Sequence, residues 1–143
     1  MSAEFNELAY ALDTFYFLIS GALVMWMAAG FTMLESGLVR SKNTTEILTK
    51  NVSLYAIACI MYMLIGYNIM YGGGISSVIP SIGGIFGASD NVPAAIAAGS
   101  DAYYSNISDF FFQVVFVATA MAIVSGSVAE RMMLWTCLLL TGI

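Results

Sequence analysis

Residues 14–34 read TFYFLISGALVMWMAAGFTML, a run between Asp13 and Glu35 that holds no charged side chain. About 20 apolar residues in a helix cover the roughly 30 Å of hydrocarbon in a bilayer. The run meets this requirement and predicts a membrane-spanning helix over about residues 14–36. The residues before it carry only acidic charges, whereas a cleaved signal peptide begins with a positive region. We therefore interpret the run as a true first span.

Three further apolar runs follow the first. The second lies at about residues 51–71, the third at about 109–129, and the fourth runs from 132 onward and is incomplete. The fourth run is too short to cross a bilayer before the sequence ends. Together the runs predict an all-α membrane protein, in which residues 1–143 form part of one transmembrane helix bundle. The incomplete fourth run leads us to expect a fragment of a longer protein.

The composition excludes several classes of function. Hydrophobic residues make up 60% of the chain and charged residues only 9%, whereas a soluble domain carries about 25% charged residues, so a lipid bilayer must cover the surface. Only four residues are basic, which excludes nucleic-acid binding. No histidine is present, so we expect no enzyme site, metal site or cofactor. Cys59 and Cys137 lie in apolar runs and are interpreted as buried small side chains, not as a disulfide.

The basic residues lie in two short loops and predict the orientation. Arg40, Lys42 and Lys50 lie between the first two spans, and Arg131 lies between the third and the fourth. The N-terminal tail and the loop between the second and third spans carry only acidic charges. The positive-inside rule places the basic loops in the cytoplasm and the N-terminus outside. We expect a multi-pass protein of the cell membrane (plasma or inner membrane).

Glu35 closes the first span at its inner end. A carboxylate at mid-bilayer costs about 2.5–3.5 kcal/mol, and less near an interface. We interpret Glu35 as an edge residue capped by the adjacent serine, Arg40 or Lys42, in preference to a role in transport.

The third span carries an aromatic cluster at its outer end. Phe112 and Phe116 are four residues apart and share a helix face. They form either lipid-facing anchors or a cage that binds a small cation, worth about 0.5–2 kcal/mol, and spacing alone favours anchors. Ala118, Ala122 and Gly126 repeat every four residues along the same span. Such a stripe lets another helix approach closely and predicts a helix packed within a bundle.

Two segments resemble signatures of the ammonium transporter (Amt/Mep/Rh) family. The segment GFTMLESGLVRSKN at residues 30–43 resembles the first-helix signature of that family. The stretch from Phe112-Gln113 to IVSGSVAER at residues 123–131 resembles its third-helix signature. Both occur in the right order and at the right separation. Members have eleven membrane helices in two inverted halves, so the chain resembles the first three to four helices of an ammonium-transporter fold.

This resemblance implies transmembrane transport of ammonium or ammonia through a pore in each subunit of a homotrimer. It implies that Phe112 contributes to the outer recruitment site and that Phe116 is one of the stacked rings that gate the pore beneath it, which now favours substrate binding over anchoring. Phe31, Leu34 and Glu35 fall where the first helix of the family approaches the inner half of the pore. For a prokaryotic member, the family also implies a PII-type regulatory protein at the cytoplasmic mouth.

Two other functions stay open at this point. Some family members join the same membrane domain to a signalling module, so the chain is alternatively the ammonium-sensing membrane domain of a signalling protein. The third reading is a truncated membrane scaffold that does not transport. The sequence that follows residue 143 distinguishes the three, because a transporter needs seven further helices and a sensor needs a soluble domain after them.

Overall fold

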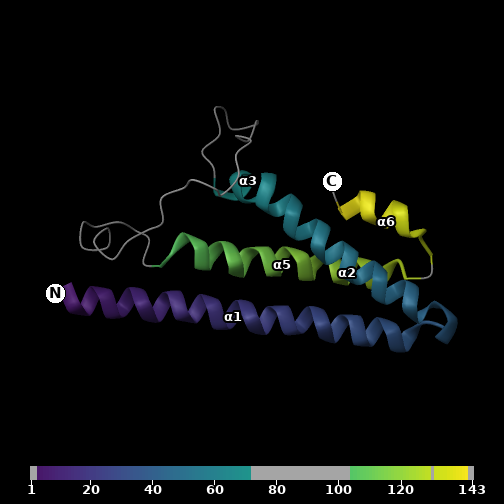
Figure 1. Cartoon of the computed structure of the whole chain (residues 1–143), viewed down its shortest axis with the longest axis horizontal. Coiled ribbons are helices and arrows are strands. Elements are labelled where there is room, and N and C mark those ends of the chain that lie inside the picture. The colour runs from purple at the N-terminus through teal and green to yellow at the C-terminus, as the bar shows by residue number, and fades with distance from the viewer. Residues whose placement is uncertain (1–2, 72–103, 130, 142–143) are drawn as a thin grey trace.

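The computed structural model describes residues 3–71, 104–129 and 131–141, and helices are the only regular elements within them (Figure 1). The elements are α1 (Ala3–Leu38), a 3-10 turn (Ser41–Asn43), α2 (Thr44–Met61), a π-helical turn (Tyr62–Gly66), α3 (Tyr67–Tyr71), α5 (Asn106–Ser127) and α6 (Leu134–Thr141). Three helical runs are long and apolar enough to cross a membrane, namely Glu4–Leu38, Ser41–Tyr71 and Asn106–Ser127. The predicted all-α membrane fold is confirmed.

The helices alternate in direction, as expected for consecutive crossings of a bilayer. In Figure 1, α1 and α5 run side by side in the same direction, and α2 returns across them in the opposite direction. The turn at the end of α5 then sends α6 back along α2. Among the described elements, α1 and α5 make the most extensive helix contact.

The helices are longer than the charge-free runs that predict them. Helix α1 begins at Ala3, well before the span predicted from about residue 14, and its 36 residues extend about 54 Å. Helix α2 begins at Thr44, ahead of the span predicted from about residue 51. The reason is that a helix continues past the hydrocarbon, whereas a run without charges marks only the part that lipid surrounds. The limits of the spans in a membrane stay predictions.

Helix α5 begins where its local sequence favours a start. Ser105 precedes it in an extended backbone conformation, and Asp109 lies in its first turn. The Ser105 carbonyl accepts the backbone N–H groups of Ser108 and Asp109 and so begins the helical hydrogen bonds. A carboxylate near a helix N-terminus interacts favourably with the helix dipole. This start sets the register of α5 and therefore the direction in which Phe112 points.

Small residues allow the close contact between α5 and its neighbours. Ala118 and Ala122, two members of the predicted packing stripe, are buried and line a cavity between α1, α2 and α5, whereas the third member, Gly126, is exposed. A Cβ atom on Gly21 of α1 would lie 2.7 Å from the ring of Phe111 in α5, so a larger residue there would displace that ring. Thr119 is fully buried, and its hydroxyl donates to the carbonyl of Val115 at 2.7 Å.

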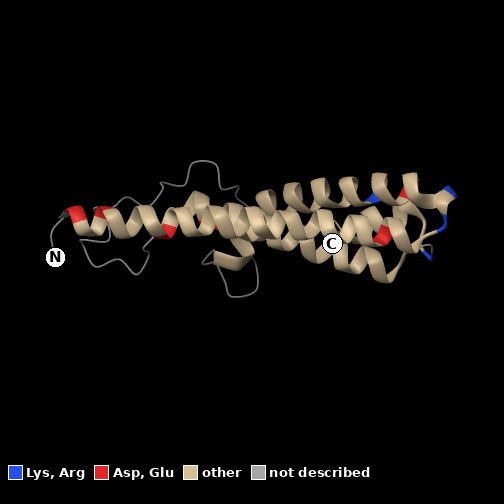
Figure 2. Ribbon diagram, turned by 90° about the horizontal axis from the view of Figure 1, so that it is seen from below, with Lys and Arg blue, Asp and Glu red and all other residues tan. Residues whose placement is uncertain are grey.

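The surface of the described chain is strongly apolar, and its positive charge lies at one end. Large side chains such as Trp26, Met33, Leu38 and Trp135 are about three-quarters exposed. Water is a poor solvent for such a surface, which agrees with a location in a membrane. Figure 2 shows that Lys and Arg gather at the end where α1 finishes and α2 starts. Both cysteines are free, as the sequence interpretation predicted.

Candidate functional site

Aromatic rings from two helices meet at the end of the bundle away from the basic residues. The Phe112 ring lies 5.9 Å from that of Phe116, centroid to centroid, and 5.6 Å edge-on from that of Phe17 in α1. The Phe17 ring in turn lies 4.6 Å from that of Tyr104, just before α5. Separations of 4.5–7 Å with tilted rings are typical of stabilising aromatic pairs. We call these four residues the aromatic cluster.

The two predicted site residues differ in exposure within this cluster. Phe112 is partly buried because Phe17 and Phe116 pack against it. Phe116 is 50% exposed. About half of its side chain is therefore left uncovered by the described residues. An aromatic face that is free on one side is the geometry that a small cation needs for a cation–π contact.

Polar groups border the aromatic cluster. Asp109 is buried and accepts a hydrogen bond from the Tyr71 hydroxyl, which itself accepts one from the Gln113 side chain at 3.3 Å. The Ser105 backbone donates to the Thr14 hydroxyl at 3.3 Å and ties the start of α5 to α1. Burial, and then the Asp109 carboxylate, raise the pKa of Tyr104, so its hydroxyl stays protonated. The cluster thus combines ring faces with a neutral hydroxyl.

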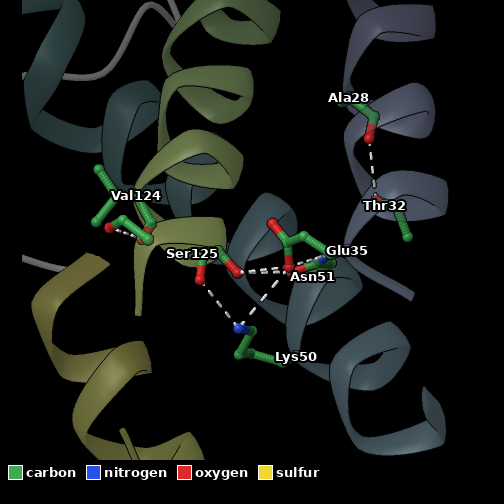
Figure 3. Close-up of polar contacts among 8 residues, drawn as sticks. Ala28, Thr32, Glu35, Lys50, Asn51, Val124 and Ser125 are labelled. Carbon is green, nitrogen blue, oxygen red and sulfur yellow. Dashed lines mark hydrogen bonds and ion pairs between the residues drawn. The ribbon is translucent and has the colours of Figure 1, made fainter. Parts of the chain in front are cut away.

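A second polar group lies at the opposite, basic end and joins three helices (Figure 3). Asn51 of α2 donates to Oε2 of Glu35 in α1 at 3.0 Å. Ser125 of α5 donates its hydroxyl to the Asn51 side-chain oxygen at 2.8 Å and lies 3.2 Å from the same Glu35 oxygen. Lys50 Nζ lies 3.9 Å from Oε2 and donates to the Ser125 carbonyl at 3.4 Å. We call these four residues the inner network.

All four residues of the inner network are buried, and one of their side-chain oxygens lacks a hydrogen-bond partner. Glu35, Lys50, Asn51 and Ser125 are exposed by 3%, 5%, 6% and 0%. Oε1 of Glu35 is buried and has no hydrogen-bond partner within the described residues. A buried charge is tolerated only when it is paired and hydrogen-bonded, so this carboxylate depends on Lys50 and on the two polar neighbours.

Sequence similarity to known proteins identifies the family of the chain. The sequence profile described as Ammonium Transporter Family matches residues 15–143. The chain belongs to the ammonium transporter family. Ammonium transporter Amt2 of Archaeoglobus fulgidus is 37% identical, over 84% of this chain and 23% of its own length. Ammonium transporter Amt2 of Methanocaldococcus jannaschii is 39% identical, over 88% of this chain and 28% of its own length. Ammonium transporter 3 of Dictyostelium discoideum is 34% identical, over 98% of this chain and 29% of its own length.

The match covers only part of each relative. The chain spans about a quarter of the length of the curated relatives it matches first. No solved structure was found to match it. Membership of the ammonium transporter family therefore rests on the sequence.

The partners of Glu35 differ from those that the sequence predicted. Ser36 donates its hydroxyl to the Met33 carbonyl in its own helix instead of capping Glu35. Lys50, predicted to lie in a loop, is buried in α2 and makes the ion pair. The reason is that α2 begins at Thr44, so Lys50 follows more than one turn of helix and points into the bundle. This family member therefore holds a buried ion pair at the basic end of the bundle.

Sequence reasoning missed the residues that complete both sites. Phe17 joins Phe112 from another helix, and no spacing along one run indicates such a contact. Asn51 and Ser125 had a usable signal, because polar residues within membrane helices face the bundle interior and have partners. Across residues 3–71, 104–129 and 131–141, no group of three or more metal-ligating side chains occurs.

Proposed function

We propose that the protein to which this chain belongs transports ammonium or ammonia across the cell membrane. The observation that carries the proposal is the aromatic cluster, in a chain whose family is the ammonium transporter family. The Archaeoglobus, Methanocaldococcus and Dictyostelium relatives are named as ammonium transporters. These names give no support to the alternatives of an ammonium sensor or a non-transporting scaffold.

The aromatic cluster supports recruitment of a small cation by simple electrostatics. The faces of Phe112 and Phe116 carry partial negative charge, and a cation within about 6 Å of a ring centre gains about 0.5–2 kcal/mol, more when water is excluded. Ammonium also donates hydrogen bonds to neighbouring oxygens such as that of the Tyr104 hydroxyl, and potassium cannot. In this proposal Phe112 contributes to the recruitment site and Phe116 controls entry to the pore beneath it.

Growth on limiting ammonium tests the proposal in cells. The intact protein, as its gene encodes it, is expressed in a host that lacks ammonium transporters of its own. We expect the protein to restore growth when ammonium is the only nitrogen source and scarce. A potassium-uptake-deficient host is the control, and we expect no rescue there. Equal failure in both hosts, with the protein present in the membrane, would contradict transport.

We also propose that the N-terminus lies outside the cell and the basic end lies in the cytoplasm. The gathering of Lys and Arg at one end of the bundle supports this orientation. In a variant with Cys59 and Cys137 replaced by alanine, Glu7→Cys should react with a membrane-impermeant thiol reagent added to intact cells. Lys42→Cys should react only after the cells are opened. The reverse pattern would overturn the orientation.

Two partners remain proposals drawn from the family resemblance. The intact protein should assemble as a homotrimer, measurable by mass in detergent. If it is prokaryotic, a PII-type regulatory protein should bind the basic cytoplasmic end, where Arg40, Lys42 and Arg131 are exposed. Neither a trimer contact nor a regulator is needed for the arrangement of the aromatic cluster described above.

A further inference from the structure

The unpartnered oxygen of Glu35 lies beside a cavity between α1 and α5 at the basic end of the bundle. The cavity has a volume of about 330 Å³ and is lined by apolar residues of α1, such as Phe31, by Glu35, and by Ile123 and Gly126 of α5. Figure 3 shows one Glu35 oxygen turned toward the inner network and the other turned away from it. The second oxygen, Oε1, lies 3.2 Å from where a Cβ atom on Gly126 would be.

This cavity lies on the same face of α5 as the aromatic cluster. At about 100° per residue, Phe116, Ile123 and Gly126 all lie within about 40° of Phe112 around the helix axis. Along α1, Phe17 contacts Phe112 near the middle of the helix, and Glu35 approaches Gly126 near its C-terminal end. Phe112 and Gly126 therefore lie on one face of α5, and both approach residues of α1.

A buried carboxylate oxygen without a donor is costly, which argues for a ligand. Leaving a charged acceptor unsatisfied costs more free energy than leaving a neutral one unsatisfied. Oε2 already has Asn51, Ser125 and Lys50 within reach. Oε1 is therefore able to accept a hydrogen bond. Because the terminal torsion of a Glu side chain rotates easily, a small rotation of the carboxylate presents Oε1 to the cavity. Gly126 leaves the space that this turn needs.

We propose that Oε1 of Glu35 binds the permeating ammonium or ammonia by accepting an N–H hydrogen bond at the inner end of the path. This inference rests on the proposed transport function and deepens it by adding a second permeant site. Lys50, at 3.9 Å from Oε2, offsets part of the carboxylate charge. The site therefore holds the permeant without trapping it, as conduction through successive sites requires.

Two substitutions test the site, one in the carboxylate itself and one in the space beside it. Glu35→Gln removes the charge, and Gly126→Ala places a methyl group against Oε1 while it leaves Oε2 and its partners in place. The matched controls are Glu46→Gln, an exposed glutamate at the same end, and Gly37→Ala, where an added Cβ meets nothing within 4 Å. Uptake of radiolabelled methylammonium is measured with the intact protein in liposomes.

We expect both test variants to lower the maximal uptake rate about threefold to tenfold. The half-saturating concentration should change less than twofold, because recruitment at the aromatic cluster is unaffected. The controls should match the wild-type protein. A rate loss that only follows loss of folded protein, or rates equal to those of the controls, would overturn the proposal. Gly126→Ala decides the matter if Glu35→Gln does not fold.

Infrared difference spectroscopy separates a permeant site from a water site. Ammonium chloride, compared with potassium chloride, should shift a carboxylate band of the intact protein, and Glu35→Gln should remove that shift. Identical spectra with the two salts would mean that Oε1 binds only water, which overturns the proposal. Wild-type protein without any methylammonium uptake would count against the transport function itself. Normal uptake by the wild-type protein, together with Glu35 variants that leave uptake unchanged, would count only against the inner site.

Discussion

Replacing Lys50 by methionine is expected to lower the free energy of unfolding by about 3–5 kcal/mol. The substitution keeps a side chain of similar length but removes the only cation within 4 Å of the Glu35 carboxylate among the described residues. That carboxylate is 3% exposed, so water cannot replace the lost charge. The measurement is a denaturant titration of the purified intact protein in detergent, with helical circular dichroism as the signal.

A double variant and a surface control separate charge from packing. Lys42→Met removes an exposed cation near the same end of the bundle and should change stability by less than about 0.5 kcal/mol. Adding Glu35→Gln to Lys50→Met removes the uncompensated charge and should restore most of the lost stability. If Lys50→Met is as stable as Lys42→Met, or if Glu35→Gln restores nothing, Glu35 and Lys50 do not form a buried ion pair.

Replacing Phe112 by leucine should raise the half-saturating ammonium concentration about 2-fold to 30-fold. This range is the loss of a cation–π contact of about 0.5–2 kcal/mol. Leucine keeps an apolar side chain of comparable size in contact with Phe17 and Phe116, so the helix pair should stay folded. Uptake is measured over a range of ammonium concentrations with the intact protein in liposomes, and the amount of folded protein is used for normalisation.

Two further variants decide between substrate binding and anchoring for Phe112. Phe112→Tyr keeps a ring and should keep the half-saturating concentration within about twofold. Phe15→Leu removes an exposed ring of α1 outside the aromatic cluster and should leave uptake unchanged. Equal effects of Phe112→Leu and Phe15→Leu would indicate that Phe112 only anchors the helix in lipid.

The membrane helices were predictable because lipid imposes a strong constraint on sequence. A run such as residues 14–34 must be long and free of charge, whatever else the helix does. The shared face of Phe112 and Phe116 follows from helix geometry alone, and the structure confirms that their rings meet. The packing of Ala118 follows from the same geometry, since a small side chain every fourth residue marks a line of close approach.

The inner network was not predictable from single runs because its contacts join different helices. A span recognised by the absence of charge ends at the first charge, so Lys50 falls outside the predicted span although helix α2 buries it. Its partner Glu35 lies on α1, and the position of Ser125 depends on the register of α5 against both. The same holds for Phe17, whose contact with Phe112 depends on the packing of α1 on α5.

The most direct test of the central claim is ammonium flux through the purified intact protein in liposomes. An inward ammonium gradient is applied, and flux is compared with that of liposomes without protein and with an equal potassium gradient. The account predicts saturable ammonium flux, little potassium flux, and a higher half-saturating concentration for Phe112→Leu. Ammonium flux no greater than that of protein-free liposomes, from correctly folded protein, would contradict it.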